Sequence, residues 1–294
     1  MRMIYEHILS NKAKSYVLFS LIVALVIFLG FVIGSIYGNG YAGIILAAVI
    51  AVIYALISYY SGDKIALAVS HAVPANKKDH AYLINTVEGL SIAAGLPKPN
   101  VYVMNDDAIN AFATGRNPEH ASIAVTTGAI KKLNRQELEG VIAHEMSHIG
   151  NYDIRFMMLV VVMIGMISII SNFFIRMMWF GGGSRDDRNN LGIILLLVGV
   201  ILAIFAPLVG QLIQLAISRK REYLADASGA LLTRYPKGLA DALRKIKKEN
   251  MPMKKVDKSV ASLFIANPLK SGWLNNMFST HPPIDERIKR LDEM

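Results

Sequence analysis

Four long apolar runs constrain this chain of 294 residues more than any other feature of its sequence. They cover residues 16–37, 42–61, 156–175 and 191–217. A helix rises 1.5 Å per residue, so runs of this length can cross a hydrocarbon core of about 30 Å. Only Gly38-Asn39-Gly40-Tyr41 separates the first two runs, so we expect two helical hairpins. For the second pair, a buried core pair or an interfacial lid stays open as an alternative.

The distribution of positive charge predicts how these hairpins are oriented. The formal net charge is +9, and residues 62–155 carry nine Lys or Arg. Residues 218–294 carry sixteen, whereas the loop at residues 176–190 carries three, offset by Asp186 and Asp187. The positive-inside rule therefore predicts a multi-pass protein of the inner or plasma membrane, with both termini and the catalytic domain in the cytoplasm. The bilayer accounts for the basic charge, so we expect no nucleic-acid partner.

The runs divide the chain into four parts. Residues 1–61 are an N-terminal tail and the first hairpin, and residues 156–217 are the second hairpin. Residues 62–155 and 218–294 are then two parts of one soluble domain. The chain has no cysteine, which excludes disulfides, thiol catalysis and cysteine-ligated metal without fixing the compartment. A metal site here must use His, Asp or Glu.

The soluble parts have the periodicities of an α+β domain. We expect helices over residues 80–94 and from Asn134 onward, and strands over residues 100–104, 110–114 and 121–126. Gly95 is expected to end the first helix, because glycine adopts the left-handed conformation readily. Asn134 followed by Glu137 is a capping-box pattern, which predicts where the second helix begins.

The motif His144-Glu145-Met146-Ser147-His148 lies inside this second helix and carries the chemistry. At four-residue spacing both imidazoles project from one helix face and can share one tetrahedral ion. Glu145 can then reach a zinc-bound water, whose pKa zinc lowers towards about 7, and take its proton. A polar helix face with two solvated histidines is the alternative. Apolar neighbours on both sides favour a buried site with one zinc per chain, and Glu145 as general base.

A third protein ligand is needed to leave one position open for water. One class of zinc peptidases places a third histidine six residues after the second, but that position is Ile154 here. Glu222 is the best candidate, with Asp153 the runner-up. Asp226 lies four residues after Glu222, on the same face, where it can accept the free N–H of a ligand histidine. Alternatively, Glu222 belongs to an ordinary charged helix and pairs with a neighbouring arginine.

The whole set of motifs resembles the M48 family of zinc peptidases, and within it the HtpX-type branch of heat-shock membrane proteases. The resemblance rests on the HExxH motif together with Arg221-Glu222-Tyr223-x-Ala225-Asp226. It extends to an N-terminal membrane hairpin, to residues 110–115, and to the late run Ser279-Thr280-His281-Pro282-Pro283. It implies a zincin-like (gluzincin) α+β catalytic domain with transmembrane helices. It also implies His144, His148 and Glu222 as zinc ligands, Glu145 as general base and Asp226 as support for a ligand.

The same resemblance implies what the protein acts on and how. The expected substrates are misfolded or damaged membrane proteins and unfolded polypeptides, cleaved on the cytoplasmic side. Asn110, Ala111, Phe112 and Ala113 would form an edge strand that holds substrate by backbone pairing, although a plain sheet edge is an equal reading.

Two late residues complete the implied site. His281 would stabilise the oxyanion, or else start a helix ahead of Pro282-Pro283. Arg287 would pair with a carboxylate in the cleft and is grouped with the substrate-binding residues. Related prenyl-protein proteases have more membrane helices than this chain has apolar runs, so we do not expect that substrate class.

Two other functions are weighed against a peptidase. A membrane scaffold with a structural zinc would need a fourth protein ligand, for which Asp153 is the candidate. A transporter is disfavoured, because the ionisable cluster lies outside the apolar runs.

Overall fold

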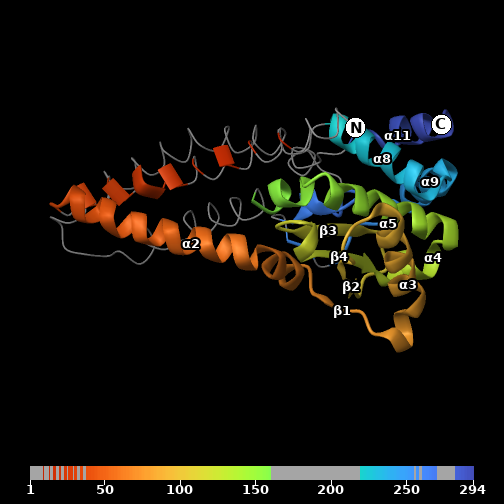
Figure 1. The fold of residues 1–294 in the computed structure, drawn as a ribbon, viewed down its shortest axis with the longest axis horizontal. Helices are drawn as coiled ribbons and strands as arrows, with labels where there is room; N and C mark the ends of the chain where they lie inside the picture. Colours follow the sequence, from red (N-terminus) through yellow and green to blue (C-terminus); the bar gives the residue numbers. More distant parts are fainter. Residues whose placement is uncertain are drawn as a thin grey trace.

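The computed structural model has an apolar helical arm joined to a mixed α/β body (Figure 1). It describes residues 38–159, 219–254, 256–257, 260–269 and 282–294, with scattered helical positions between residues 9 and 35. The third and fourth apolar runs, apart from residues 156–159, lie outside the described residues.

The arm is built around helix α2, Gly40–Val69. The Asn39 side chain caps it by accepting a hydrogen bond from the Ala42 amide at 3.0 Å. The helix continues past the predicted end at residue 61 and closes only at Ser70, before His71 turns the chain with a φ of 52°. Within the described residues no single helix is long and apolar enough to cross a membrane. The two halves of α2, Gly40–Tyr54 and Tyr59–Val69, meet that requirement only as a pair, across a bend of 66°.

The body contains a four-stranded sheet with the strand order β1-β2-β4-β3. Strand β2 (Asn100–Met104) and strand β4 (Ala121–Thr126) are parallel and match the predicted strands residue for residue. Strand β3 (Ala111–Gly115) runs antiparallel to β4 at the sheet edge, shifted by one residue from its predicted bounds. Strand β1 (Ala72–Pro74) was not predicted, because three residues ending in proline give no alternating pattern.

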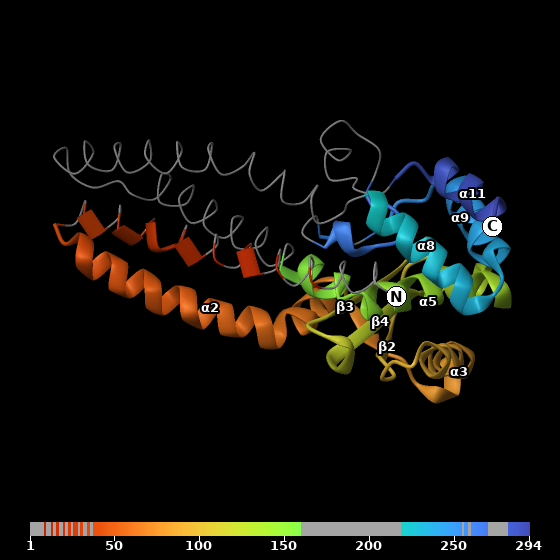
Figure 2. The same ribbon diagram turned by 45° about the horizontal axis from the view of Figure 1, so that its top comes forward.

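Helix α5 (Arg135–Gly150) is the central element of the body and lies between the sheet and α8 (Figures 1 and 2). It contacts β3 and β4 on one side and the later helices α8 and α9 on the other. The remaining helices surround it. The other helices of the body include α3 Lys77–Ala94, α4 Thr127–Lys132, α8 Arg219–Thr233, α9 Pro236–Glu249 and α11 Ile284–Asp292, with 3₁₀ turns at η1 Pro118–His120 and η2 Ala261–Leu263. Residues 153–159, just after α5, are also helical.

Close helix packing holds α5 in place, and two glycines allow it. A Cβ on Gly140 would lie 2.6 Å from the Leu239 amide nitrogen of α9. A Cβ on Gly229 of α8 would lie 3.0 Å from the His144 amide nitrogen. The apolar face of α5, including Ile142 and Met146, is buried in the core between these helices and the sheet. The backbone that carries the HExxH motif is therefore fixed from both sides.

Candidate metal centre

The start of α5 sets where its functional side chains point. Asn134 is the N-cap, and its side chain accepts a hydrogen bond from the Glu137 amide, while the Glu137 carboxylate accepts one from the Asn134 amide. The predicted capping box is therefore confirmed. His144 follows the N-cap residue Asn134 by ten residues. His144 and His148 lie about one helical turn apart on a buried face and are 0% and 5% exposed. The reading of two solvated histidines is therefore wrong.

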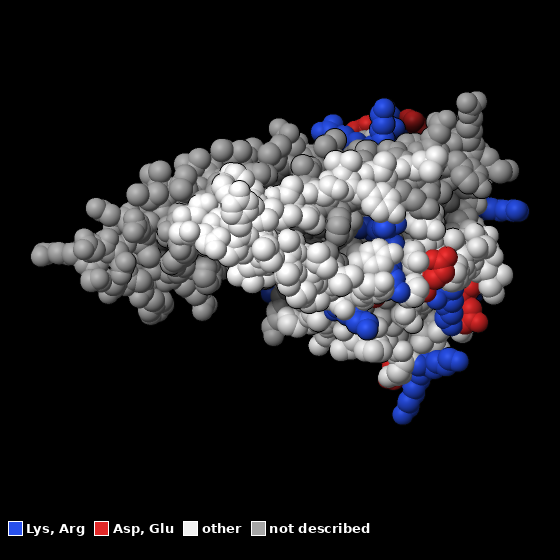
Figure 3. Space-filling model, turned by 60° about the vertical axis from the view of Figure 1, so that its left-hand side comes forward, with Lys and Arg blue, Asp and Glu red and all other residues white. Residues whose placement is uncertain are grey.

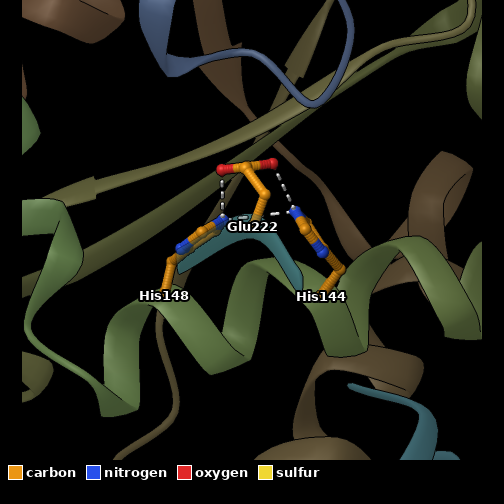
Figure 4. Close-up of side chains that lie close together, drawn as sticks. All are labelled: His144, His148 and Glu222. Carbon is orange, nitrogen blue, oxygen red and sulfur yellow. Dashed lines mark hydrogen bonds and ion pairs between the residues drawn. The ribbon is translucent and has the colours of Figure 1, made fainter. Parts of the chain in front are cut away.

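Glu222 of α8 completes a cluster with the two histidines (Figure 4). The two Nε2 atoms are 3.2 Å apart. The Glu222 carboxylate lies 3.8 Å from Nε2 of His144 and 3.6 Å from Nε2 of His148. One donor atom from each residue lies within 4.8 Å of the other two, so a single ion fits among them. Among the described residues these three form the only group of this kind.

A carboxylate and an arginine stand behind His144. Nδ1 of His144 lies 3.0 Å from Asp226 Oδ1, and Arg287 donates to both Asp226 oxygens at 2.9 and 2.7 Å. Arg287 also donates to the Ile265 carbonyl at 3.2 Å. Because a carboxylate only accepts, Nδ1 of His144 carries the proton and its Nε2 lone pair faces the cluster.

A second carboxylate and arginine stand behind His148 in the same arrangement. Asp153 Oδ2 lies 3.0 Å from Nδ1 of His148, and its Oδ1 lies 3.1 Å from Nε of Arg221. Asp153 comes close because Tyr152, with φ of 59°, reverses the chain just after α5 ends. Asp153 is therefore on the outer side of the ring, away from the three ligand atoms, and does not occupy a fourth ligand position in this structure.

These surroundings make the two histidines electrostatically different. Burial lowers the pKa of His144 to about 4, against the hydrogen bond with Asp226, so His144 is neutral at pH 7. Burial also lowers the pKa of His148, but the hydrogen bond to Asp153 and the charge of Glu222 outweigh it and raise the pKa to about 9. Without metal, His148 therefore holds an extra proton that its Nε2 can donate to His144.

Glu145, the residue between the two candidate ligands of α5, is 1% exposed and close enough to His148 and Glu222 to feel their charges. Burial raises its pKa to about 7, and the nearby charge of His148 works against this rise. It also accepts a hydrogen bond from the Ala113 backbone, which ties it to strand β3. A carboxyl group with a pKa near 7 can both accept and return a proton at neutral pH.

The predicted substrate strand lies beside Glu145 at the sheet edge, but its side chains face inward. Phe112 is fully buried and packs on Phe264 with ring centroids 5.0 Å apart. The side-chain amide of Asn110 donates through Nδ2 to the Ala266 carbonyl at 3.0 Å. The backbone N–H of Ile265 donates to the Ala111 carbonyl at 2.9 Å. The chain's own segment therefore pairs with the start of the β3 edge.

The other predicted site residues have distinct placements. Arg287 was grouped with substrate-binding residues, but it is 1% exposed and its guanidinium bonds to Asp226, so here it pairs with a carboxylate without facing solvent. His281 lies outside the described residues. Arg221 appeared in the sequence only as part of a motif. Its pairing with Asp153 was missed, because nothing in the spacing of these two residues signals a contact.

A mixed sheet, a helix bearing two histidines and a buried glutamate, and a glutamate from a later helix together define a metalloprotease. Such a centre requires a donor set of this kind, two imidazoles and one carboxylate, with each imidazole ring oriented by a carboxylate at its Nδ1 atom.

Comparison with known proteins identifies the family. The model of peptidase family M48 matches residues 77–294, and the chain belongs to this family. A protease HtpX homolog of Caldanaerobacter subterraneus is 53% identical over 244 residues, covering 82% of this chain and 81% of the relative. Homologs of the same description from Dictyoglomus turgidum and Lactobacillus helveticus are 46% and 42% identical, each over 99% of this chain and over 94% and 100% of the relative. The chain is therefore an HtpX-type M48 protease.

The fold is also similar to a solved structure. The crystal structure of S. mikatae Ste24p aligns with a TM-score of 0.53 at 18% identity, covering 98% of this chain and 67% of that one. At this identity the likeness concerns the fold alone.

Proposed function

We propose that this chain is a zinc-dependent integral-membrane endopeptidase that hydrolyses misfolded or damaged membrane proteins on the cytoplasmic side. The observation that carries the proposal is the convergence of the His144 and His148 Nε2 atoms on the Glu222 carboxylate, with Glu145 buried beside them. Two nitrogen donors and one carboxylate suit zinc, and three protein ligands leave a position open as catalytic sites require.

The donor atoms also fit the ion chemically. Each histidine is held at Nδ1 by a carboxylate, which fixes the ring and makes Nε2 the available donor. Bound zinc would polarise the scissile carbonyl and lower the pKa of an attacking water.

Glu145 would perform the proton transfers. Its carboxylate would take a proton from the attacking water and deliver it to the departing amine of the cleaved peptide bond. Its pKa of about 7 suits both steps at neutral pH.

The outer edge of β3 would hold the substrate. Asn110 pairs through its backbone with Thr126 of β4, so the backbone groups of Ala111 and Ala113 point to the outer edge of β3, away from β4. The Ala111 carbonyl pairs with Ile265, and the Ala113 backbone with Glu145. We propose that an extended peptide pairs along this edge next to Glu145, as strand addition does elsewhere.

The arm supports the membrane part of the proposal. Residues 40–60 of α2 carry no charge, and large apolar side chains such as Ile45 (67% exposed) and Leu46 (63%) face outward. Figure 3 shows the described arm as a white surface, with charged side chains gathered on the body. Burying this surface in lipid removes it from water, and the lysine and arginine excess of the body favours the cytoplasmic side.

A metal-removal experiment on the purified full-length protein tests this function. Incubation with 1,10-phenanthroline should abolish cleavage of casein and of a destabilised membrane protein reconstituted in the same vesicles, and added zinc should restore it. A folded variant of that membrane protein should resist cleavage. Cleavage that persists after the metal has been removed would refute the zinc mechanism, and equal cleavage of both variants would refute the substrate class.

A further inference from the structure

Two arginines and three tyrosines form a cluster where the arm meets the body, and none of them is among the candidate metal ligands. The Arg116 guanidinium lies over the rings of Tyr59 and Tyr60, with its carbon 5.7 and 5.1 Å from their centroids. The Arg155 guanidinium lies over Tyr59 at 5.5 Å and over Tyr16 at 5.2 Å. Both cations therefore share the Tyr59 ring, although they come from distant parts of the chain.

Neither arginine has an anionic partner among the described residues. Arg221 and Arg287 pair with buried carboxylates, and Arg135, Arg244 and Arg290 pair with surface ones. No such ion pair is formed by Arg116 or Arg155 within the described residues. The Nε–H of Arg155 is buried and donates to nothing there. A buried donor without an acceptor is uncommon in proteins and points to a group that the described residues do not supply.

The cluster lies at the end of the apolar arm, where α2 enters the body. Tyr59 and Tyr60 follow the bend of α2, at the end of its uncharged stretch of residues 40–60. Tyr16 and Tyr60 are 60% and 55% exposed, so the cluster reaches the surface. Tyrosine and arginine at the end of an apolar helix belong at the headgroup level of a bilayer, where anionic phosphates are available.

We propose that Arg116 and Arg155 bind the phosphate of an anionic lipid headgroup, within the tyrosine cluster of residues 16, 59 and 60. A guanidinium is planar and donates in pairs, which matches the oxygens of a phosphate, and stacking on tyrosine leaves its edge free to do so. This inference rests on the membrane part of the proposed function. The lipid would tie the arm to the body, because α2, the residue after β3 and the helical segment that follows α5 each contribute to the cluster.

Thermal unfolding of the full-length protein in a non-ionic detergent tests the site. Phosphatidylglycerol added to the micelles should raise the Tm of the wild type by at least about 3 °C over phosphatidylcholine at the same amount. R116Q/R155Q should lose most of this rise. The matched control K77Q/K78Q also removes two positive charges, but from exposed positions of α3, and it should keep the rise in Tm.

Two further measurements keep the test decisive. If inorganic phosphate alone raises the Tm as much as phosphatidylglycerol does, the site takes free phosphate and the lipid assignment fails. Native mass spectrometry of the wild type needs no variant. It should show phosphatidylglycerol retained at collision energies that strip phosphatidylcholine, and equal retention would overturn the proposal even if R116Q/R155Q did not fold.

The outcome can be separated from that of the proposed function. Casein cleavage measured in the same micelles should be zinc-dependent in the wild type and in R116Q/R155Q. Zinc-dependent cleavage without any lipid preference would overturn the lipid site alone. Failure of zinc-dependent cleavage together with a clear lipid preference would overturn the peptidase proposal and leave the lipid site standing.

Discussion

At the scale of residues, the two candidate ligand histidines are held in parallel ways. Each presents Nε2 to the cluster and Nδ1 to a carboxylate, and an arginine holds each carboxylate in turn. The consequences differ, because only His148 keeps an extra proton at neutral pH in the absence of metal.

The Asp226–Arg287 pair gives the first prediction. Asp226→Asn removes the anion behind His144, so metal affinity should fall about 10- to 100-fold. It also removes the carboxylate closest to the buried Arg287 guanidinium, which then keeps only Glu222 at 3.6 Å, and this should cost up to about 3–5 kcal/mol of unfolding free energy. Zinc titration and denaturant unfolding measure the two effects separately.

A second substitution separates these effects. Adding Arg287→Met to Asp226→Asn should recover part of the stability but not metal affinity, because the poorly compensated buried charge is gone while His144 still lacks its support. Glu139→Gln breaks an exposed pair with Arg135 and should change the unfolding free energy by less than about 1 kcal/mol. Unchanged zinc affinity in Asp226→Asn would contradict the role assigned to this carboxylate.

The proton on His148 gives a prediction about pH. Its pKa is raised to about 9, so between pH 7.5 and 8.5, where the Glu145 carboxyl with its pKa of about 7 is mostly ionised, binding of zinc must displace one proton from His148. His144, with a pKa lowered to about 4, is already neutral in this range. The apparent zinc affinity should therefore rise about tenfold per pH unit, measured against a chelator corrected for its own protonation. A slope near zero, or near two protons, would contradict this assignment.

At the scale of elements, helix α5 is where sequence and structure agree most closely. The Asn134–Glu137 capping box is local chemistry that the sequence contains in full, and so are the alternating strands β2 and β4. The contacts behind the histidines are not local. Asp153 with Arg221, and Asp226 with Arg287, meet only because α8 packs beside α5 and α11 packs beside α8, and no spacing in the chain encodes that.

Close packing at Gly140 gives a prediction at this scale. Gly140→Ala would place a methyl group 2.6 Å from the backbone nitrogen of Leu239, so α5 and α9 must move apart. We expect a loss of about 1–3 kcal/mol in unfolding free energy, measured by denaturant unfolding. Gly89→Ala is the matched control on α3. Its Cβ meets nothing within 4 Å, so helix propensity should make it neutral or stabilising by up to about 1 kcal/mol. Equal effects of the two substitutions would show that this contact does not hold α5.

At the scale of the whole molecule, the arm and the body have different roles. The body positions the candidate metal centre, and the uncharged arm carries the exposed apolar surface. The sequence predicted an apolar second run but not the bend between Tyr54 and Tyr59, since no proline or glycine lies at that point.

The absence of cysteine makes the proposed membrane topology directly measurable. A single cysteine at Lys78→Cys should react with a membrane-impermeant maleimide in vesicles that expose the cytoplasmic face. Ile45→Cys should react only after detergent dissolves the bilayer, because lipid covers this face of α2. Labelling of Ile45→Cys in intact vesicles would contradict insertion of the arm, and labelling of Lys78→Cys only from the opposite face would reverse the orientation.

The central claim is that the HExxH helix forms a catalytic zinc site in which Glu145 moves the proton, and Glu145→Gln tests it most directly. The amide has the shape of the carboxylate but cannot accept the proton, and the residue is no ligand. Wild type and variant should each hold about one zinc per chain, with cleavage of casein reduced at least about 100-fold in the variant. Cleavage retained in Glu145→Gln, or no zinc in either protein purified without chelators, would contradict the account.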